Sequence, residues 1–80
     1  MLVSLRQNMW MYLWLKDQYK EEFYDIIFPV NAANARPDIM NKKLAEFLAS
    51  KGYENKLTRK GDIVFSMIDK EYTYLKLKYY

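Results

Sequence analysis

The chain has 80 residues, which is enough for one modest hydrophobic core, and we expect residues 1–80 to form a single domain. Apolar residues make up 51% of the sequence and aromatic residues 18%, a composition that excludes an intrinsically disordered chain. Its net charge is +3, and it has no cysteine or histidine, which excludes disulfides, thiolate chemistry and histidine metal ligands. We therefore expect a cytoplasmic protein without a cofactor.

The first element that the sequence predicts is a long helix from about Asn8 to Phe28. Apolar side chains recur along it at spacings of three and four residues: Tyr12, Leu15, Tyr19, Phe23, Ile26 and Ile27. Pro29 would end this helix, because a proline disfavours the helical conformation of the residue before it.

The run Met9–Leu15 is apolar around its whole circumference, so it is either the start of that helix or a central strand before a shorter helix from Asp17. It is far too short to span a bilayer, which takes about 20 residues, and no signal-peptide cleavage site follows it. It also offers more apolar surface than one helix face can bury. Four residues are therefore candidates for a protein interface as well as for the core: Met9, Trp10, Met11 and Trp14. Of the two tryptophans, we expect Trp14 in the core and Trp10 at the interface.

A turn or very short helix is expected at Val30–Ala35, and a second clear helix follows it. Pro37 suits the first turn of that helix, and Gly52 provides a left-handed stop at its end. The predicted buried face consists of Met40, Leu44, Phe47 and Leu48, with Ile39 at its edge. The predicted outer face consists of Asn41, Lys42, Ala45 and Ala49.

Beyond Gly52 the pattern predicts an antiparallel hairpin that extends into a meander. The expected strands are Tyr53–Arg59, Ile63–Ile68 and Tyr72–Tyr79, separated by turns at residues 60–62 and 69–71. In the last strand, Tyr72 and Tyr74 would share a face with Lys76 and Lys78, where they could stack on single-stranded bases. Two helices followed by this meander make an α+β fold.

The basic charge is concentrated between Arg36 and Lys60. This stretch contains three acidic residues and seven basic ones, namely Arg36, Lys42, Lys43, Lys51, Lys56, Arg59 and Lys60. Such a surplus suits a polyanionic partner such as nucleic acid, although it is also compatible with an ordinary solvated surface.

The order of helix, Gly-Tyr, basic strand, tight turn and apolar strand resembles a winged-helix domain, in particular the one at the C-terminus of phage and plasmid primase-helicases. The likeness covers roughly residues 10–68 and is carried by Ile39–Leu44, by the LxxxGY sequence of Leu48–Tyr53 and by Lys56–Phe65. The sequence departs from that family in the short Val30–Ala35 segment and in the strand expected at Tyr72–Tyr79.

The resemblance implies a non-enzymatic domain that binds duplex DNA, and we expect it to act as a dimer. Asn41 would read a base in the major groove, while Lys42, Lys56, Arg59 and Lys60 would neutralise phosphates. The alternative is a protein-binding module, such as a phage-type inhibitor or adaptor, with the aromatic N-terminal helix as its interface. No phosphate-binding loop or nucleophile motif is present, so we do not expect an enzyme.

Overall fold

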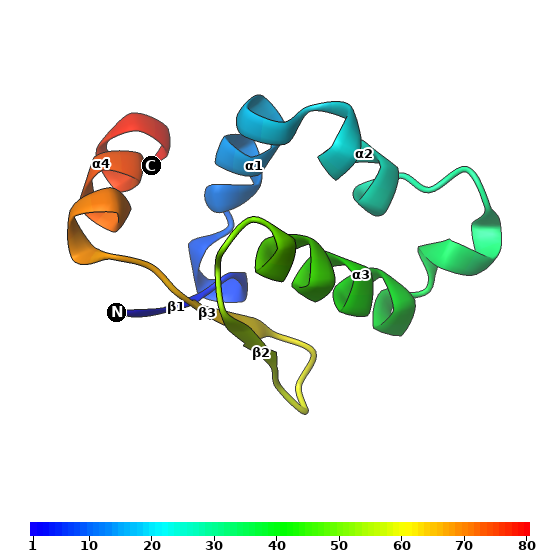
Figure 1. The fold of residues 1–80 in the computed structure, drawn as a ribbon. Helices are drawn as coiled ribbons and strands as arrows, with labels where there is room; N and C mark the ends of the chain where they lie inside the picture. The colour runs from blue at the N-terminus through cyan, green and yellow to red at the C-terminus, as the bar shows by residue number, and fades with distance from the viewer.

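The computed structural model describes the backbone of all 80 residues and every side chain except those of Ala32 and Asn34. The fold is α+β, as predicted (Figure 1). Along the described backbone the elements follow in the order β1 (Leu2–Ser4), η1 (Arg6–Asn8, a 3-10 helix), α1 (Met11–Tyr19), α2 (Glu21–Ile27), η2 (Ala32–Ala35, also 3-10), α3 (Pro37–Ser50), β2 (Asn55–Leu57), β3 (Ile63–Ser66) and α4 (Asp69–Tyr79).

The three strands form one antiparallel sheet in the order β1-β3-β2. Val3 of β1 lies opposite Phe65 of β3, and Lys56 of β2 lies opposite Val64. Val3, Ile63 and Phe65 are buried and join the hydrophobic core. Figure 1 shows the helices above the sheet and the turn of the β2–β3 hairpin pointing away from α4. This arrangement is compatible with a winged-helix-like fold.

Helix α3 and the β2–β3 hairpin are both present where the sequence predicts a helix and a hairpin. Pro37 opens α3, and Gly52 follows its end with a φ of +91°, a conformation that favours glycine. Gly61 provides the positive φ of the hairpin turn at +82°, and the backbone N–H of Thr58 donates to the carbonyl of Asp62 at 2.7 Å. Both strands are shorter than predicted.

The long helix expected from Asn8 to Phe28 is wrong, because the chain breaks at Lys20 between α1 and α2. Lys20 has a φ of +49° and a ψ of −118°, outside the helical region. The break allows Phe23 to fold back, so that its ring lies 5.9 Å from the ring of Tyr12. In a straight helix eleven residues span about 16 Å, so the two rings could not meet. The alternative of a strand at Met9–Leu15 is also wrong, since Met11–Leu15 is helical.

The strand expected at Tyr72–Tyr79 is wrong as well, because this segment is the helix α4. Leu75 is buried and Tyr72 and Tyr79 pack partly against the core, at spacings that match one face of a helix. The ring of Tyr72 lies 5.8 Å from that of Trp10, and its hydroxyl donates to Oδ1 of Asn8 at 2.9 Å. Tyr74 is exposed instead, so Tyr72 and Tyr74 do not form the shared stacking face that a strand would give.

The third strand of the sheet is β1, which the sequence prediction missed. It pairs with β3, more than 50 residues away along the chain, and the short helix η1 follows it. Val3 and Leu5, both buried, anchor this segment to the core.

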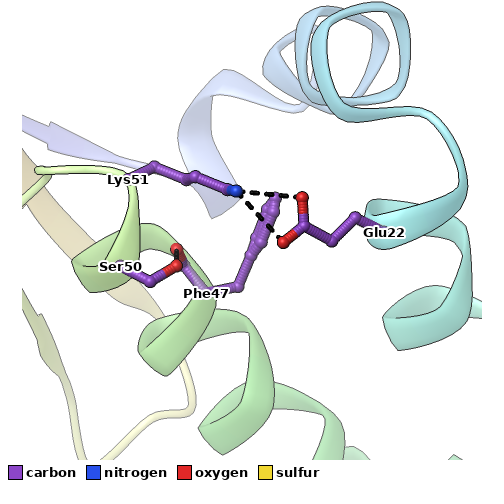
Figure 2. A network of polar contacts seen from close by, with 4 residues as sticks. All are labelled: Glu22, Phe47, Ser50 and Lys51. Atoms are coloured by element: carbon purple, nitrogen blue, oxygen red, sulfur yellow. Dashed lines mark hydrogen bonds and ion pairs between the residues drawn. The ribbon is translucent and has the colours of Figure 1, made fainter.

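The break between α1 and α2 is stabilised where α2 meets the end of α3. Figure 2 shows Nζ of Lys51 facing both carboxylate oxygens of Glu22. It donates to Oε1 at 3.0 Å and to Oε2 at 2.9 Å. The same ammonium lies 5.0 Å from the ring centre of Tyr19 and 5.4 Å from that of Phe47. These contacts hold α2 close to the end of α3. Among the helices of the described chain, none is both long and apolar enough to cross a bilayer.

Candidate nucleic-acid interface

The hairpin turn is tied to η1 by the carboxylate of Asp62. This carboxylate accepts hydrogen bonds from the hydroxyl of Ser4 and from the backbone N–H of Arg6, the latter at 3.0 Å. Nη2 of Arg6 in turn donates to the carbonyl of Lys60 at 2.8 Å. The N-terminal segment and the hairpin turn are therefore joined into one unit, although they lie more than 50 residues apart in sequence.

Asp62 is an anion at neutral pH. Partial burial alone would raise its pKa, but the hydrogen bonds from Ser4 and from backbone N–H groups, together with the charge of Arg6, hold the pKa below its usual range. The carboxylate thus keeps its charge and remains an acceptor for both partners. The hydrogen bonds that hold the hairpin turn are therefore made to the deprotonated form of Asp62, which is the form present at neutral pH.

Four cationic side chains, which we call the hairpin cations, are exposed around this unit: Arg6, Lys56, Arg59 and Lys60. Three of them were predicted as phosphate contacts. Arg6 was missed, because nothing in the sequence near it indicates that it lies beside the hairpin turn. Its hydrogen bond to the Lys60 carbonyl places it there.

The outer face of α3 differs from the prediction. Lys42 and Ala49 are exposed as expected, but Asn41 and Ala45 are half-buried, so the four residues do not share one outer face. Asp38 and Glu46 are exposed on α3 alongside Lys42 and Lys43, which makes the exposed charge of this part of the helix neutral. The basic surface therefore belongs to the hairpin and η1 rather than to α3.

Asn41 faces the hairpin turn. A Cβ atom added at Gly61 would lie 3.3 Å from Nδ2 of Asn41 and 3.5 Å from Nη2 of Arg6. These side chains line a hollow of about 320 Å³, which we call the hairpin hollow. Its lining consists of Leu5, Arg6, Met9, Tyr12, Asn41, Gly61, Asp62 and Ile63.

A second, larger hollow of about 640 Å³ runs along β2. Leu2, Val64 and Leu57 provide apolar lining, and Lys56 and Arg59 also line it. Two of the hairpin cations thus border this second hollow, while Arg6 lines the hairpin hollow. Three of the four hairpin cations therefore line one hollow or the other.

The four residues predicted as a protein interface differ in how far they are exposed. Met9 is 60% exposed, whereas Met11 and Trp14 are buried in the core, so these two are inaccessible to a partner. Trp14 packs edge-on against Tyr53, with ring centres 5.6 Å apart, in agreement with its expected place in the core. Trp10 is half-buried against Tyr72 rather than free at the surface. The aromatic N-terminal segment is therefore mainly core.

Comparison of the chain with protein-family models, with curated proteins and with solved structures finds no match.

Proposed function

We propose that this chain is a small, non-enzymatic nucleic-acid-binding domain of winged-helix-like architecture. The β2–β3 hairpin and η1 bind the phosphate backbone, and α3 lies beside them with Lys42 as an additional phosphate contact. Support comes from the order of elements, in which α3 leads into a basic hairpin whose second strand is the centre of the sheet.

One observation carries the proposal, namely the placement of the four hairpin cations around a single rigid unit. The hairpin turn is held against η1 by the hydrogen bond that the Asp62 carboxylate accepts from the backbone of Arg6 and by the one that the Arg6 side chain donates to Lys60. The four cations therefore belong to one backbone unit rather than to separate segments. A fixed set of cations neutralises several phosphates at once and releases the counterions condensed around them. The grouping of these four side chains on one backbone unit therefore favours a polyanion over a single anionic group.

The proposal is tested by the salt dependence of binding, measured by fluorescence anisotropy with labelled duplex DNA, single-stranded DNA and RNA. The logarithm of the affinity should fall linearly with the logarithm of the salt concentration, with a slope of about −0.9 per phosphate contact on duplex DNA and about −0.7 on single strands. Reversing Arg59 and Lys60 to glutamate should weaken binding to every sequence alike and flatten this slope.

The matched control reverses two exposed lysines of α4, Lys70→Glu and Lys78→Glu, which changes the net charge by the same amount. If the control weakens binding as much as the hairpin variant, only the overall charge matters and the hairpin is not the binding surface. No binding to any of the three nucleic acids at low salt would refute the function itself.

A protein-binding module is the second candidate function, and one observation favours it. At the end of α2 the rings of Tyr24 and Phe28 stack on the surface, with ring centres 5.7 Å apart, and Phe28 is 68% exposed. Val30 beside them is fully exposed. A second copy of the chain, as expected from the sequence, or another protein could cover this pair. Sedimentation of Phe28→Ser against the parent chain would test the dimer, because loss of this ring should shift a dimer toward the monomer.

A further inference from the structure

We propose that the hairpin hollow receives one unstacked nucleobase of the bound nucleic acid, so that the protein prefers single-stranded or locally opened strands to an intact duplex. This inference rests on the proposed function and specifies the substrate class of the same surface. It is carried by the size of the hollow, by the polar side chains of Asn41 and Tyr12 that line it and by the balance of charge inside it.

The size and lining of the hairpin hollow suit a single planar group. Its volume of about 320 Å³ is near the lower limit for small-molecule sites, which run from about 300 to 1,000 Å³. Met9 is 60% exposed, and its thioether can contact an aromatic ring favourably, whereas Leu5 and Ile63 are each only 2% exposed and offer little apolar surface. The lining is therefore about as polar as it is apolar, which suits a planar group that carries hydrogen-bonding atoms on its edge.

Two half-buried polar side chains, the amide of Asn41 and the hydroxyl of Tyr12, line the hollow. Among the described residues no buried side-chain nitrogen or oxygen lacks a hydrogen-bond partner, so these two groups have not left water unpaired. A ligand in the hollow would bond them in place of solvent. An asparagine amide both donates and accepts, and it can bond two adjacent groups on the edge of adenine at once. The amide of Asn41 therefore matches the edge of a base.

Tyr12 can act as a hydrogen-bond donor in the hollow. Burial, and after it the negative charge of Asp62, raises the pKa of the Tyr12 hydroxyl above its usual value, while Arg6 opposes this effect. The hydroxyl therefore stays protonated at neutral pH. It offers a second polar contact to a base that already bonds Asn41.

The charges inside the hollow disfavour a phosphate as its occupant. Arg6 contributes one positive charge, on a guanidinium that donates to the carbonyl of Lys60, and Asp62 contributes one negative charge. A neutral group can enter without an electrostatic penalty, whereas an anion would approach the carboxylate of Asp62. The phosphates on either side of the base would instead contact Arg59 and Lys60, which are exposed in the hairpin turn beside the hollow.

Gly61 lets the side chains of Asn41 and Arg6 approach the hairpin turn closely. A methyl group at this position would lie 3.3 Å from Nδ2 of Asn41 and 3.5 Å from Nη2 of Arg6, and the backbone φ of +82° already disfavours any other residue. The glycine therefore fixes where these two side chains border the hollow.

A base in an intact duplex could not use this site. Paired bases offer only their edges in a groove, and the half-buried amide of Asn41 does not project from α3 to reach into one. The base has to leave the stack, which costs a few kcal/mol in a duplex and least where the base is already single-stranded. Single strands should therefore bind more tightly than duplexes of the same length at the same salt concentration.

The test compares two single-stranded oligomers of equal length, oligo-deoxyadenosine and an abasic deoxyribose-phosphate oligomer that lacks every base. The parent chain should bind the adenine oligomer roughly 10-fold more tightly, as expected for one bidentate contact to adenine. Asn41→Ala should lose most of this preference while binding the abasic oligomer as the parent does. An oligomer carrying 2-aminopurine should gain fluorescence on binding, because this adenine analogue brightens when it leaves a stack.

Two further variants complete the test. Tyr12→Phe keeps the ring and removes only the hydroxyl, so it should reduce the adenine preference even if Asn41→Ala proves unstable. Lys43→Ala, an exposed residue of α3 that does not line the hollow, should leave the preference unchanged.

The base hypothesis is overturned if the parent binds both oligomers equally, or if Asn41→Ala and Tyr12→Phe both keep the full preference. In either case, weakened binding by the variant with Arg59 and Lys60 reversed would still support the proposed function. Failure of the parent chain to bind either oligomer or duplex DNA would refute both proposals together.

Discussion

At the hairpin end of the molecule, Asp62 and Arg6 hold the backbone in place through hydrogen bonds, and the side chains around them are exposed cations. Where α1 meets α4 and the start of β2, the contacts are between aromatic rings instead. Trp14 packs edge-on against Tyr53, and the hydroxyl of Tyr53 donates to Glu71. Burial, reinforced by this hydrogen bond, raises the pKa of Tyr53, so the hydroxyl remains a donor at neutral pH.

Under the proposed function, this difference places stability and nucleic-acid binding in separate parts of the chain. Removal of a buried ring leaves a cavity and loses apolar burial, which are the largest single-residue costs in a small domain. Removal of an exposed cation changes stability little but takes away a phosphate contact. We therefore expect substitutions of the buried rings to lower the melting temperature. Substitutions of the hairpin cations should weaken binding and leave the melting temperature nearly unchanged.

The largest expected effect is on stability, for Trp14→Ala. Trp14 is only 5% exposed, and truncating a buried tryptophan costs about 3–5 kcal/mol. Domains have total stabilities of about 5–15 kcal/mol, so the variant should melt far below the parent or be unfolded at room temperature. Thermal melting followed by circular dichroism measures the change.

Trp10→Ala is the matched control for this substitution. Its half-buried ring, tilted against Tyr72, should give a clearly smaller loss of stability. Equal melting temperatures for the two variants would contradict the placement of α1 and α4.

A smaller, pH-dependent effect is expected for Asp62→Asn. Because the folded state lowers the pKa of Asp62, its charge stabilises the fold above the ordinary value of 3.8, and this contribution is lost as the pH falls through the folded pKa. The variant should be less stable by about 1 kcal/mol at pH 7, a modest value because the carboxyl is partly solvated. Urea unfolding at pH 7 and pH 3 should show the two proteins converging at the lower pH. A difference that grows at pH 3 would show that the charge of Asp62 does not stabilise the fold.

The smallest expected effect concerns the pair of Lys51 and Glu22. Lys51→Met should lose about 0.5–1 kcal/mol, because it removes both the ion pair and the contacts of the ammonium with the rings of Tyr19 and Phe47. Glu22→Gln removes the ion pair alone and should lose less. Denaturant titrations at low and high salt distinguish the two, since only the ion pair is strongly screened. A greater loss for Glu22→Gln would mean that the ring contacts contribute nothing.

Local signals in the sequence are sufficient to predict α3 and the β2–β3 hairpin. Pro37, Gly52 and Gly61 each have a fixed backbone preference, and the apolar spacing from Met40 to Leu48 matches only a helix. These features depend on neighbours within a few residues. For that reason the α+β class could be predicted from the sequence.

The sequence-based predictions of secondary structure were wrong where contacts between distant residues decide the local structure. Tyr72, Leu75 and Tyr79 have helical spacing, but Tyr72–Tyr79 also alternates with period two, and only packing against α1 settles the choice. The break at Lys20 has no glycine or proline to mark it, and the contact of Phe23 with Tyr12 that it allows lies between residues eleven positions apart. Strand β1 is too short to be recognised without its distant partner, β3.

Only part of the candidate site could be predicted from the sequence. The charge of Lys56, Arg59 and Lys60 was evident, because these residues are close together in sequence. The addition of Arg6 and the inward placement of Asn41 required the tertiary structure, because both depend on contacts with the distant hairpin turn. The hairpin hollow is consequently a feature that no single segment of the sequence indicates.

The most direct test of the central claim, that the hairpin end binds nucleic acid, is NMR titration of the isotopically labelled protein with a single-stranded oligonucleotide. Backbone amide signals of residues 58–62 and 6–8, and of the first half of α3, should shift together and in proportion to the bound fraction. Signals of α4, residues 69–79, should stay in place. Shifts confined to α4 or to the exposed rings of Tyr24 and Phe28, with the hairpin turn unchanged, would contradict the account.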